Sequence, residues 1–157
     1  TLIEPYYGNR TKRLIKSPKL AFLDTGLAVF LAGLRTEQDL FRSSLAGAIW
    51  ESYVFGQILR HTGSKGAPAT INYWRTASGP EVDLVIEEGS TKVAAVECKL
   101  KERPDIMDSA GLRALEEAEK GKITMKILAC RTKVTYKLSD GTWVLNPSEL
   151  LKVLKIG

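Results

Sequence analysis

Residues 79–100 read GPEVDLVIEEGSTKVAAVECKL, and this stretch decides the fold. It contains two apolar runs, 81–87 and 92–100, that have the length and the residue types of β-strands. The glycine and serine between the two runs are typical of a turn. The stretch therefore predicts a β-hairpin whose strands lie side by side.

Charged side chains occupy particular faces of the two predicted strands. Alternate residues of a strand share a face, so Glu97 and Lys99 are expected side by side, with Cys98 on the opposite face. In the first strand, Asp83 is expected on the same face as Glu81. The opposite face of that strand is assigned to the apolar residues Val82, Leu84 and Ile86. Because burial of an unpaired carboxylate is costly, the acidic residues require a counter-charge.

Strand and helix signals alternate along the rest of the chain. Apolar runs bounded by turn residues predict further strands at 70–75, 123–130, 134–138 and 142–145. Helical spacing and capping residues predict helices that run from Asp24 or Thr25 to about 34, from Ser43 or Ser44 to about 61, over 110–120, and over 148–154. The third of these helices separates the strands 92–100 and 123–130, which favours their parallel pairing. The predicted fold class is therefore α/β.

Two further segments complete the predicted layout. A turn-like Gly8-Asn9 within residues 2–16 indicates a short hairpin, and residues 62–68 predict a surface loop. The helix that ends near residue 61 is expected to bury one apolar side. That side includes Leu45, Ile49 and Tyr53.

Composition limits the class of protein. The 157 residues, 44% of them hydrophobic, suffice for one domain with its own core. Lys and Arg number 23 against 18 Asp and Glu, and the resulting net charge of +5 is compatible with nucleic acid as a partner. Cys98 and Cys130 lack a CxxC spacing, so both are expected to be buried free thiols in a reducing compartment. A cytoplasmic protein without a membrane partner is expected, because no apolar run reaches the length of a membrane span.

The carboxylates of the hairpin carry the functional prediction. If the register brings Asp83 beside Glu97, a divalent cation would relieve the repulsion between their charges. Mg²⁺ and Mn²⁺ prefer oxygen ligands of this kind. Such an ion can generate a hydroxide nucleophile at a phosphate, while Lys99 positions the attacking water or neutralises developing charge. The same spacing also fits an exposed cross-strand ion pair without any metal.

The order of these residues resembles a known superfamily. A helical Glu51 is followed by Gly79-Pro80-Glu81-Val82-Asp83 and then by Val96-Glu97-Cys98-Lys99, and this order resembles the PD-(D/E)XK nucleases. In particular, the chain resembles the domain of unknown function found at the C-terminus of archaeal and bacterial AAA-type P-loop ATPases. Three more stretches match the usual phrases of that domain: KRLIKSPKL at 12–20, FLDTGLA at 22–28 and YWRT at 73–76.

The resemblance implies a restriction-endonuclease-like mixed sheet flanked by helices over residues 19–157. It implies that Asp83, Glu97 and Glu51 ligate Mg²⁺ or Mn²⁺, and that Lys99 joins them in an active site that cleaves nucleic acid, with DNA expected first. It also implies an ATPase domain upstream in the same protein, with residues 1–18 as the tail of that region, which could be a winged-helix hairpin. One departure from the family pattern is Cys98, which stands where an aliphatic residue is usual.

Two other classes of function stay open at this point. The same fold can serve as a catalytically inactive module of an ATPase that recognises DNA or protein. A purely structural or oligomerisation domain would instead show a large exposed apolar patch and would self-associate.

Overall fold

The computed structural model describes residues 1–6, 17–64, 69–77, 79–88 and 92–154. The hairpin predicted around Gly8-Asn9 and residues 65–68 of the predicted loop lie outside this described part. The described strands are β1 (Leu2–Pro5), β2 (Lys19–Leu20), β3 (Ala69–Arg75), β4 (Glu81–Glu88), β5 (Lys92–Lys99), β6 (Ile123–Cys130), β7 (Tyr136–Lys137) and β8 (Trp143–Leu145).

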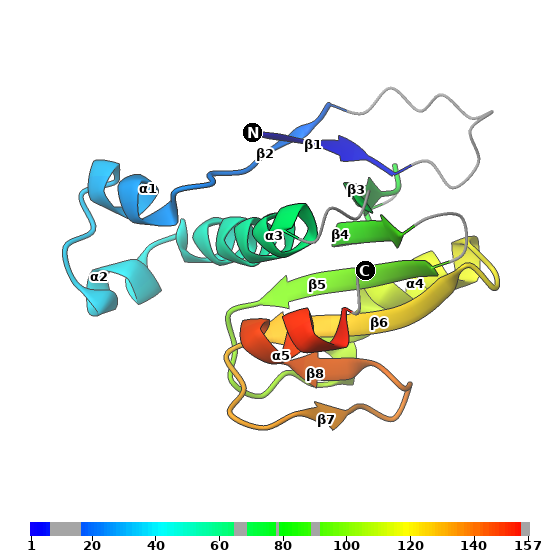
Figure 1. The fold of residues 1–157 in the computed structure, drawn as a ribbon. Helices are drawn as coiled ribbons and strands as arrows, with labels where there is room; N and C mark the ends of the chain where they lie inside the picture. The colour runs from blue at the N-terminus through cyan, green and yellow to red at the C-terminus, as the bar shows by residue number, and fades with distance from the viewer. Residues whose placement is uncertain (7–16, 65–68, 78, 89–91, 155–157) are drawn as a thin grey trace.

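These strands form one mixed sheet in the order β2-β1-β3-β4-β5-β6-β8-β7 (Figure 1). β4 and β5 pair antiparallel, with Leu84 opposite Val96, which confirms the predicted hairpin. β5 and β6 pair in parallel, with Val96 opposite Ile127. The pairing predicted from the helix between those two strands is therefore also confirmed.

Helices cover both faces of the sheet. The described helices are α1 (Thr25–Leu31), α2 (Glu37–Arg42), α3 (Ala46–Ser64), α4 (Ala110–Ala118), which follows the 3₁₀ turn Ile106–Ser109, and α5 (Pro147–Val153). Three of them cover the sheet. α3 and α5 pack on one face and α4 packs on the other (Figure 1). The predicted α/β class, a mixed sheet flanked by helices, is confirmed. Among the described residues, every helix is too short or too polar to cross a membrane.

Alternation along β4 and β5 divides the core into two clusters. Leu84 and Val96 belong to the cluster under α3 and α5, whereas Val85 and Ala95 belong to the cluster under α4.

The two cysteines lie on opposite faces of the sheet. Cys130 is a buried free thiol under α4, as predicted. Cys98 packs on the α3 side, away from the face of its charged neighbours, and is half-buried rather than buried.

β4 departs from strict alternation at Val82. Asn72 of β3 faces Val85 and Trp74 faces Val82, so three steps along β4 match two along β3. The extra residue forms a β-bulge and turns Val82 into the cluster under α4. The prediction that Val82 shares a face with Leu84 was therefore wrong, because strict alternation takes no account of a bulge.

α3 has two apolar faces, and only one packs on the sheet. The sheet-facing side contains the buried residues Val54, Phe55 and Ile58. Leu45 and Tyr53, predicted to be buried, are exposed, and Ile49 is half-buried. That prediction was wrong because their face turns toward α1 and α2, which stand beyond the sheet at one end of α3 (Figure 1). α3 also continues through Ser64, so the predicted loop cannot begin at residue 62.

Capping residues set the starts of α1 and α2. Oδ1 of Asp24 accepts a hydrogen bond from the amide of Leu27 at 2.8 Å, so Asp24 is the cap of α1. α2 was not predicted. It begins at a capping box in which Thr36 and Asp39 bond each other's backbone amides.

Candidate functional site

Asp83 lies where β4 and β5 stop pairing. The last pair at this end joins Leu84 to Val96, and the next residues along the two strands are Asp83 and Glu97. Here Oδ2 of Asp83 accepts a hydrogen bond from the backbone amide of Cys98 at 2.9 Å. A side-chain oxygen thus takes the place of a backbone carbonyl, and Asp83 is fixed with only 7% of its surface exposed.

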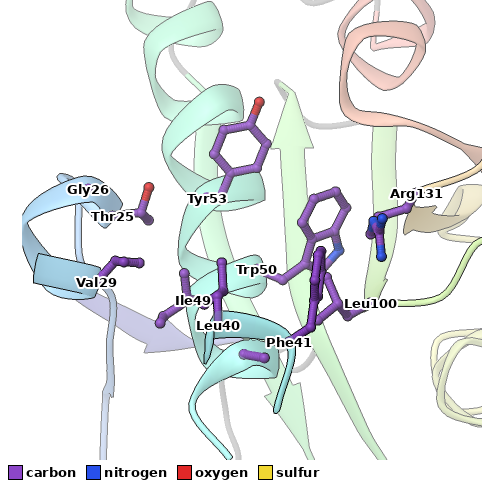
Figure 2. Close-up of a pocket in the computed structure, with 11 residues that line it drawn as sticks. Thr25, Gly26, Val29, Leu40, Phe41, Ile49, Trp50, Tyr53, Leu100 and Arg131 are labelled. Carbon is purple, nitrogen blue, oxygen red and sulfur yellow. The ribbon is translucent and has the colours of Figure 1, made fainter. Parts of the chain in front are cut away.

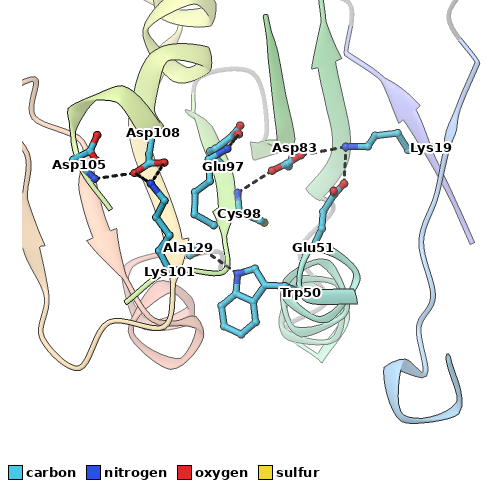
Figure 3. Close-up of polar contacts among 11 residues, drawn as sticks. Lys19, Trp50, Glu51, Asp83, Glu97, Cys98, Lys101, Asp105, Asp108 and Ala129 are labelled. Atoms are coloured by element: carbon cyan, nitrogen blue, oxygen red, sulfur yellow. Dashed lines mark hydrogen bonds and ion pairs between the residues drawn. The ribbon is translucent and has the colours of Figure 1, made fainter. Parts of the chain in front are cut away.

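The second oxygen of Asp83 faces a lysine from the edge of the sheet. Nζ of Lys19 lies 3.2 Å from Oδ1 of Asp83 and 2.6 Å from Oε1 of Glu51 (Figure 3). Glu51 comes from α3 and Lys19 from β2, so three separate elements meet at this point. Strand alternation pointed to Asp83 and the family resemblance added Glu51, but Lys19 was not predicted as a site residue. The reason is that Lys19 and Asp83 are 64 residues apart, and no spacing rule connects them.

Glu97 and Lys99 form a second ion pair. Nζ of Lys99 lies 2.8 Å from Oε1 of Glu97, as expected for neighbours on one face of a strand. The other oxygen, Oε2, is buried and accepts no hydrogen bond from any described residue. α4 approaches it closely at Gly111, where a Cβ atom would lie 3.7 Å from Oε2 and would overlap the carbonyl oxygen of Glu81. The glycine therefore allows the helix to close over Glu97.

Burial and mutual repulsion shift the acidity of the site. Burial raises the pKa of Glu97 to about 7, the charge of Asp83 adds to the increase, and the bond to Lys99 opposes it. The pKa of Glu51 is raised by burial and by Asp83, against the effect of Lys19. Burial lowers the pKa of Lys99, but its contact with Glu97 and the negative charge of Asp83 outweigh burial and raise that pKa. The site thus holds charged lysines beside two glutamates, Glu51 and Glu97, whose pKa values are raised.

The four predicted residues and Lys19 form two charged groups: Lys99 pairs with Glu97, and Lys19 pairs with both Glu51 and Asp83. Figure 3 shows Asp83 between Glu97 on one side and the Lys19 and Glu51 pair on the other. Within the described part of the chain, no three Asp, Glu, His or Cys side chains lie close enough together to hold a metal ion as they stand. A cation held by all three carboxylates would therefore require these side-chain contacts to rearrange.

An apolar hollow of about 340 Å³ lies between α3 and the pair formed by α1 and α2 (Figure 2). Its lining residues include Val29, Leu40, Phe41, Ile49, Trp50 and Leu100. Nε1 of Trp50 donates to the carbonyl oxygen of Ala129 at 3.1 Å, which fixes the indole ring. The guanidinium carbon of Arg131 lies 4.2 Å from the ring centre of Phe41. The hollow is thus built by the face of α3 that sequence reasoning had assigned to the core.

Residues 46–150 match a protein family described as Domain of unknown function (DUF4143). The chain belongs to the DUF4143 family. Four residues of the site, Glu51, Asp83, Glu97 and Lys99, lie within the matched DUF4143 segment. Lys19 precedes that segment, so a strand outside it supplies the cation that pairs with two of its carboxylates.

Two curated proteins are similar to this DUF4143 chain. They are the uncharacterized protein Rv2008c of Mycobacterium tuberculosis and the uncharacterized protein Mb2031c of Mycobacterium bovis, each 36% identical over 85 residues. The match covers 54% of this chain and only 18% of each relative, so the chain corresponds to a small part of those proteins. No solved structure matches the DUF4143 chain.

Proposed function

We propose that this DUF4143 domain is a nuclease-like domain of the PD-(D/E)XK type, which hydrolyses phosphodiester bonds of nucleic acid with Mg²⁺ or Mn²⁺. One observation carries the proposal: Oε2 of Glu97 is buried beside Asp83 and accepts no hydrogen bond from any described residue. A carboxylate oxygen that has lost water without gaining a donor is unfavourable. A bound cation would remove that cost, so the residues present fit a metal ion.

Three carboxylates are available to hold the ion. Asp83 and Glu97 would contribute oxygens from β4 and β5, and Glu51 would contribute one from α3. Carboxylate oxygens are the ligands that Mg²⁺ and Mn²⁺ prefer. The bound ion would activate a water molecule and offset the negative charge that develops on the phosphate.

Lys99 would act on the attacking water or on the phosphate. The raised pKa of Lys99 keeps its ammonium charged. The contact of this ammonium with Oε1 of Glu97 at 2.8 Å holds it near the point where β4 and β5 separate. From there it can donate a hydrogen bond to the water or to a phosphate oxygen. Its preorganised charge would therefore favour the transition state rather than the bound substrate.

The positive net charge of the chain suits nucleic acid as the substrate, and DNA is the nucleic acid expected first. A net charge of +5 attracts a phosphate backbone without selecting a sequence. The resemblance to restriction-endonuclease-like enzymes supports DNA over small phosphodiesters. A cytoplasmic location is consistent with such a substrate.

We further propose that the domain belongs to a longer protein that carries an AAA-type ATPase domain upstream. The resemblance supports this, and so does the length of the relatives, of which the matched segment covers only 18%. In that arrangement residues 1–18 would be the tail of the upstream region.

Calorimetric titration with Mn²⁺ tests the metal site. We expect the wild type to bind Mn²⁺ and Glu97→Gln to lose most of that affinity, because the amide cannot supply the anionic oxygen. Glu149→Gln is the matched control, since Glu149 lies on α5 and pairs only with Lys152 among the ion pairs of the described residues. Equal binding by wild type and Glu97→Gln would place the ion elsewhere, and no binding by the wild type would contradict the metal site.

A recognition module without catalysis is the second candidate function, and an apolar surface favours it. Large hydrophobic side chains are exposed along α1 and the segment before it: Phe22, Leu23, Leu27, Phe30 and Leu31. Several exposed apolar side chains on one short segment favour a protein-binding face. In this case the lysine and carboxylate pairs would be permanent, and Mn²⁺ would not bind. Sedimentation would then separate a module for other partners, which stays monomeric, from an oligomerisation domain, which self-associates.

A further inference from the structure

We propose that Lys19 is an internal counter-ion of the Glu51 and Asp83 pair, and that a divalent cation binds these carboxylates only by displacing the Lys19 ammonium. The inference rests on the proposed function, because it concerns the same site. It adds a residue that lies outside the DUF4143 segment and that competes with the metal rather than ligating it.

The contacts of Lys19 are those of a bridging cation. Its Nζ lies 2.6 Å from Oε1 of Glu51 and 3.2 Å from Oδ1 of Asp83, so one positive charge is shared by two negative ones. Both carboxylates are more buried than the lysine: their side chains are 23% and 10% exposed, against 29% for Lys19. The ammonium therefore occupies the position where these two oxygens would meet a metal ion.

When its three carboxylates are ionised, the cluster carries more negative charge than its lysines cancel. Lys19 and Lys99 contribute two positive charges, whereas the ionised Glu51, Asp83 and Glu97 would contribute three negative ones. The unbonded Oε2 of Glu97, in a residue only 7% exposed, lies next to this cluster. A dication in place of one lysine would balance the charge better, which gives the displacement its driving force.

The carboxylates are anchored more firmly than the lysine. Asp83 is bonded to the backbone of β5, and Glu51 lies within the 19-residue helix α3. Lys19 stands on the two-residue strand β2, which among the described strands pairs with β1 alone. Its side chain also lies near the ring of Tyr73, 5.8 Å from the centroid, and this ring offers the ammonium a second favourable neighbour. The lysine can therefore leave the carboxylates without unfolding the site.

Removal of the Lys19 charge tests the competition. Mn²⁺ affinity is measured by calorimetry on the wild type, on Lys19→Gln and on Lys133→Gln. Lys133 is an exposed lysine after β6, so its substitution removes the same net charge away from the carboxylates. We expect Lys19→Gln to bind Mn²⁺ about tenfold more tightly or better, and Lys133→Gln to differ from wild type by less than about twofold.

A measurement on the unmodified protein guards against misfolding of the variant. Acetylation of lysine side chains by acetic anhydride, followed by mass spectrometry, compares the reactivity of Lys19 and Lys133 with and without saturating Mg²⁺. We expect Mg²⁺ to increase the acetylation of Lys19 several-fold and to leave that of Lys133 unchanged, since displacement frees the ammonium.

The outcomes separate this inference from the proposed function. Tighter Mn²⁺ binding by Lys19→Gln than by the wild type, together with Mg²⁺-dependent acetylation of Lys19, supports the competition. Equal or weaker binding by Lys19→Gln overturns the inference and leaves the metal site intact. If neither the wild type nor Lys19→Gln binds Mn²⁺, both the inference and the metal site are contradicted.

Discussion

Oδ2 of Asp83 accepts a hydrogen bond from the backbone amide of Cys98 at 2.9 Å, across the point where β4 and β5 separate. A residue proposed to bind metal therefore also closes the end of the hairpin. Loss of its side chain would disturb both roles together. The substitutions used to test the site must keep the hydrogen bond while they remove the charge.

Asparagine and alanine at position 83 are expected to differ in stability. Asp83→Ala leaves the Cys98 amide without its acceptor and should destabilise the fold by about 1 to 3 kcal/mol. Asp83→Asn retains an oxygen for that amide and should lose less, although it cannot balance the charge of Lys19. Urea unfolding of both variants measures the difference. Equal losses would show that the bond from Cys98 contributes little to the fold.

Glu97 is expected to make stability fall as the pH rises. Its pKa is about 7 in the folded chain against an ordinary value of 4.5, so the folded state binds the proton more tightly than the unfolded state. The resulting stabilisation is complete below about pH 4.5 and is lost as the pH rises through about 7, at most about 3 kcal/mol in all. Glu97→Gln removes this titration. Urea unfolding of both proteins from pH 4 to 8, without divalent ions, should show the difference between them growing with pH, and parallel curves would contradict the raised pKa.

Gly111 is expected to be indispensable for the packing of α4 over the site. A Cβ atom there would overlap the carbonyl oxygen of Glu81, so Gly111→Ala should push the helix away and cost at least about 2 kcal/mol. Gly47→Ala is the control, because nothing lies within 4 Å of a Cβ at that helical glycine. The control should be neutral or slightly stabilising. Thermal unfolding distinguishes the two, and a neutral Gly111→Ala would mean that α4 is free to shift.

Alanine substitutions at two leucines should show whether the apolar surface of α1 is exposed to solvent or covered by another molecule. Leu31 is 70% exposed, so Leu31→Ala should change the free energy of unfolding by less than about 0.5 kcal/mol. Leu150 is fully buried, and Leu150→Ala should cost about 2 to 5 kcal/mol. Urea unfolding provides both values. A loss of similar size at Leu31 would show that this face is covered in solution, as in a self-associated form.

The parts of the fold predicted correctly from the sequence are those where local pattern and burial agree. β4, β5 and β6 lie at the centre of the sheet with helices on both faces, so their apolar runs are long and unambiguous. The side-by-side placement of Glu97 and Lys99 followed from strand alternation, because β5 keeps regular pairing with β6 over that stretch. The family resemblance added Glu51, which composition alone would have left as a surface residue.

The parts that were missed depend on tertiary contacts. The position of Lys19 is fixed by partners far along the chain, and Val82 changes face because of one extra residue in β4. Leu45 and Tyr53 follow helical spacing as core residues do, but the sheet covers only the opposite side of α3. α2 carried a detectable signal, since Thr36 and Asp39 have the spacing of a capping box.

The most direct test of the account is cleavage of end-labelled DNA in Mg²⁺ by wild type and Glu97→Gln, purified in parallel, with RNA as a second substrate. We predict that the wild type cuts, that EDTA stops the reaction, and that Glu97→Gln is at least about a hundredfold slower. No cleavage of either nucleic acid by the wild type, or equal cleavage by Glu97→Gln, would contradict phosphodiester hydrolysis at this site.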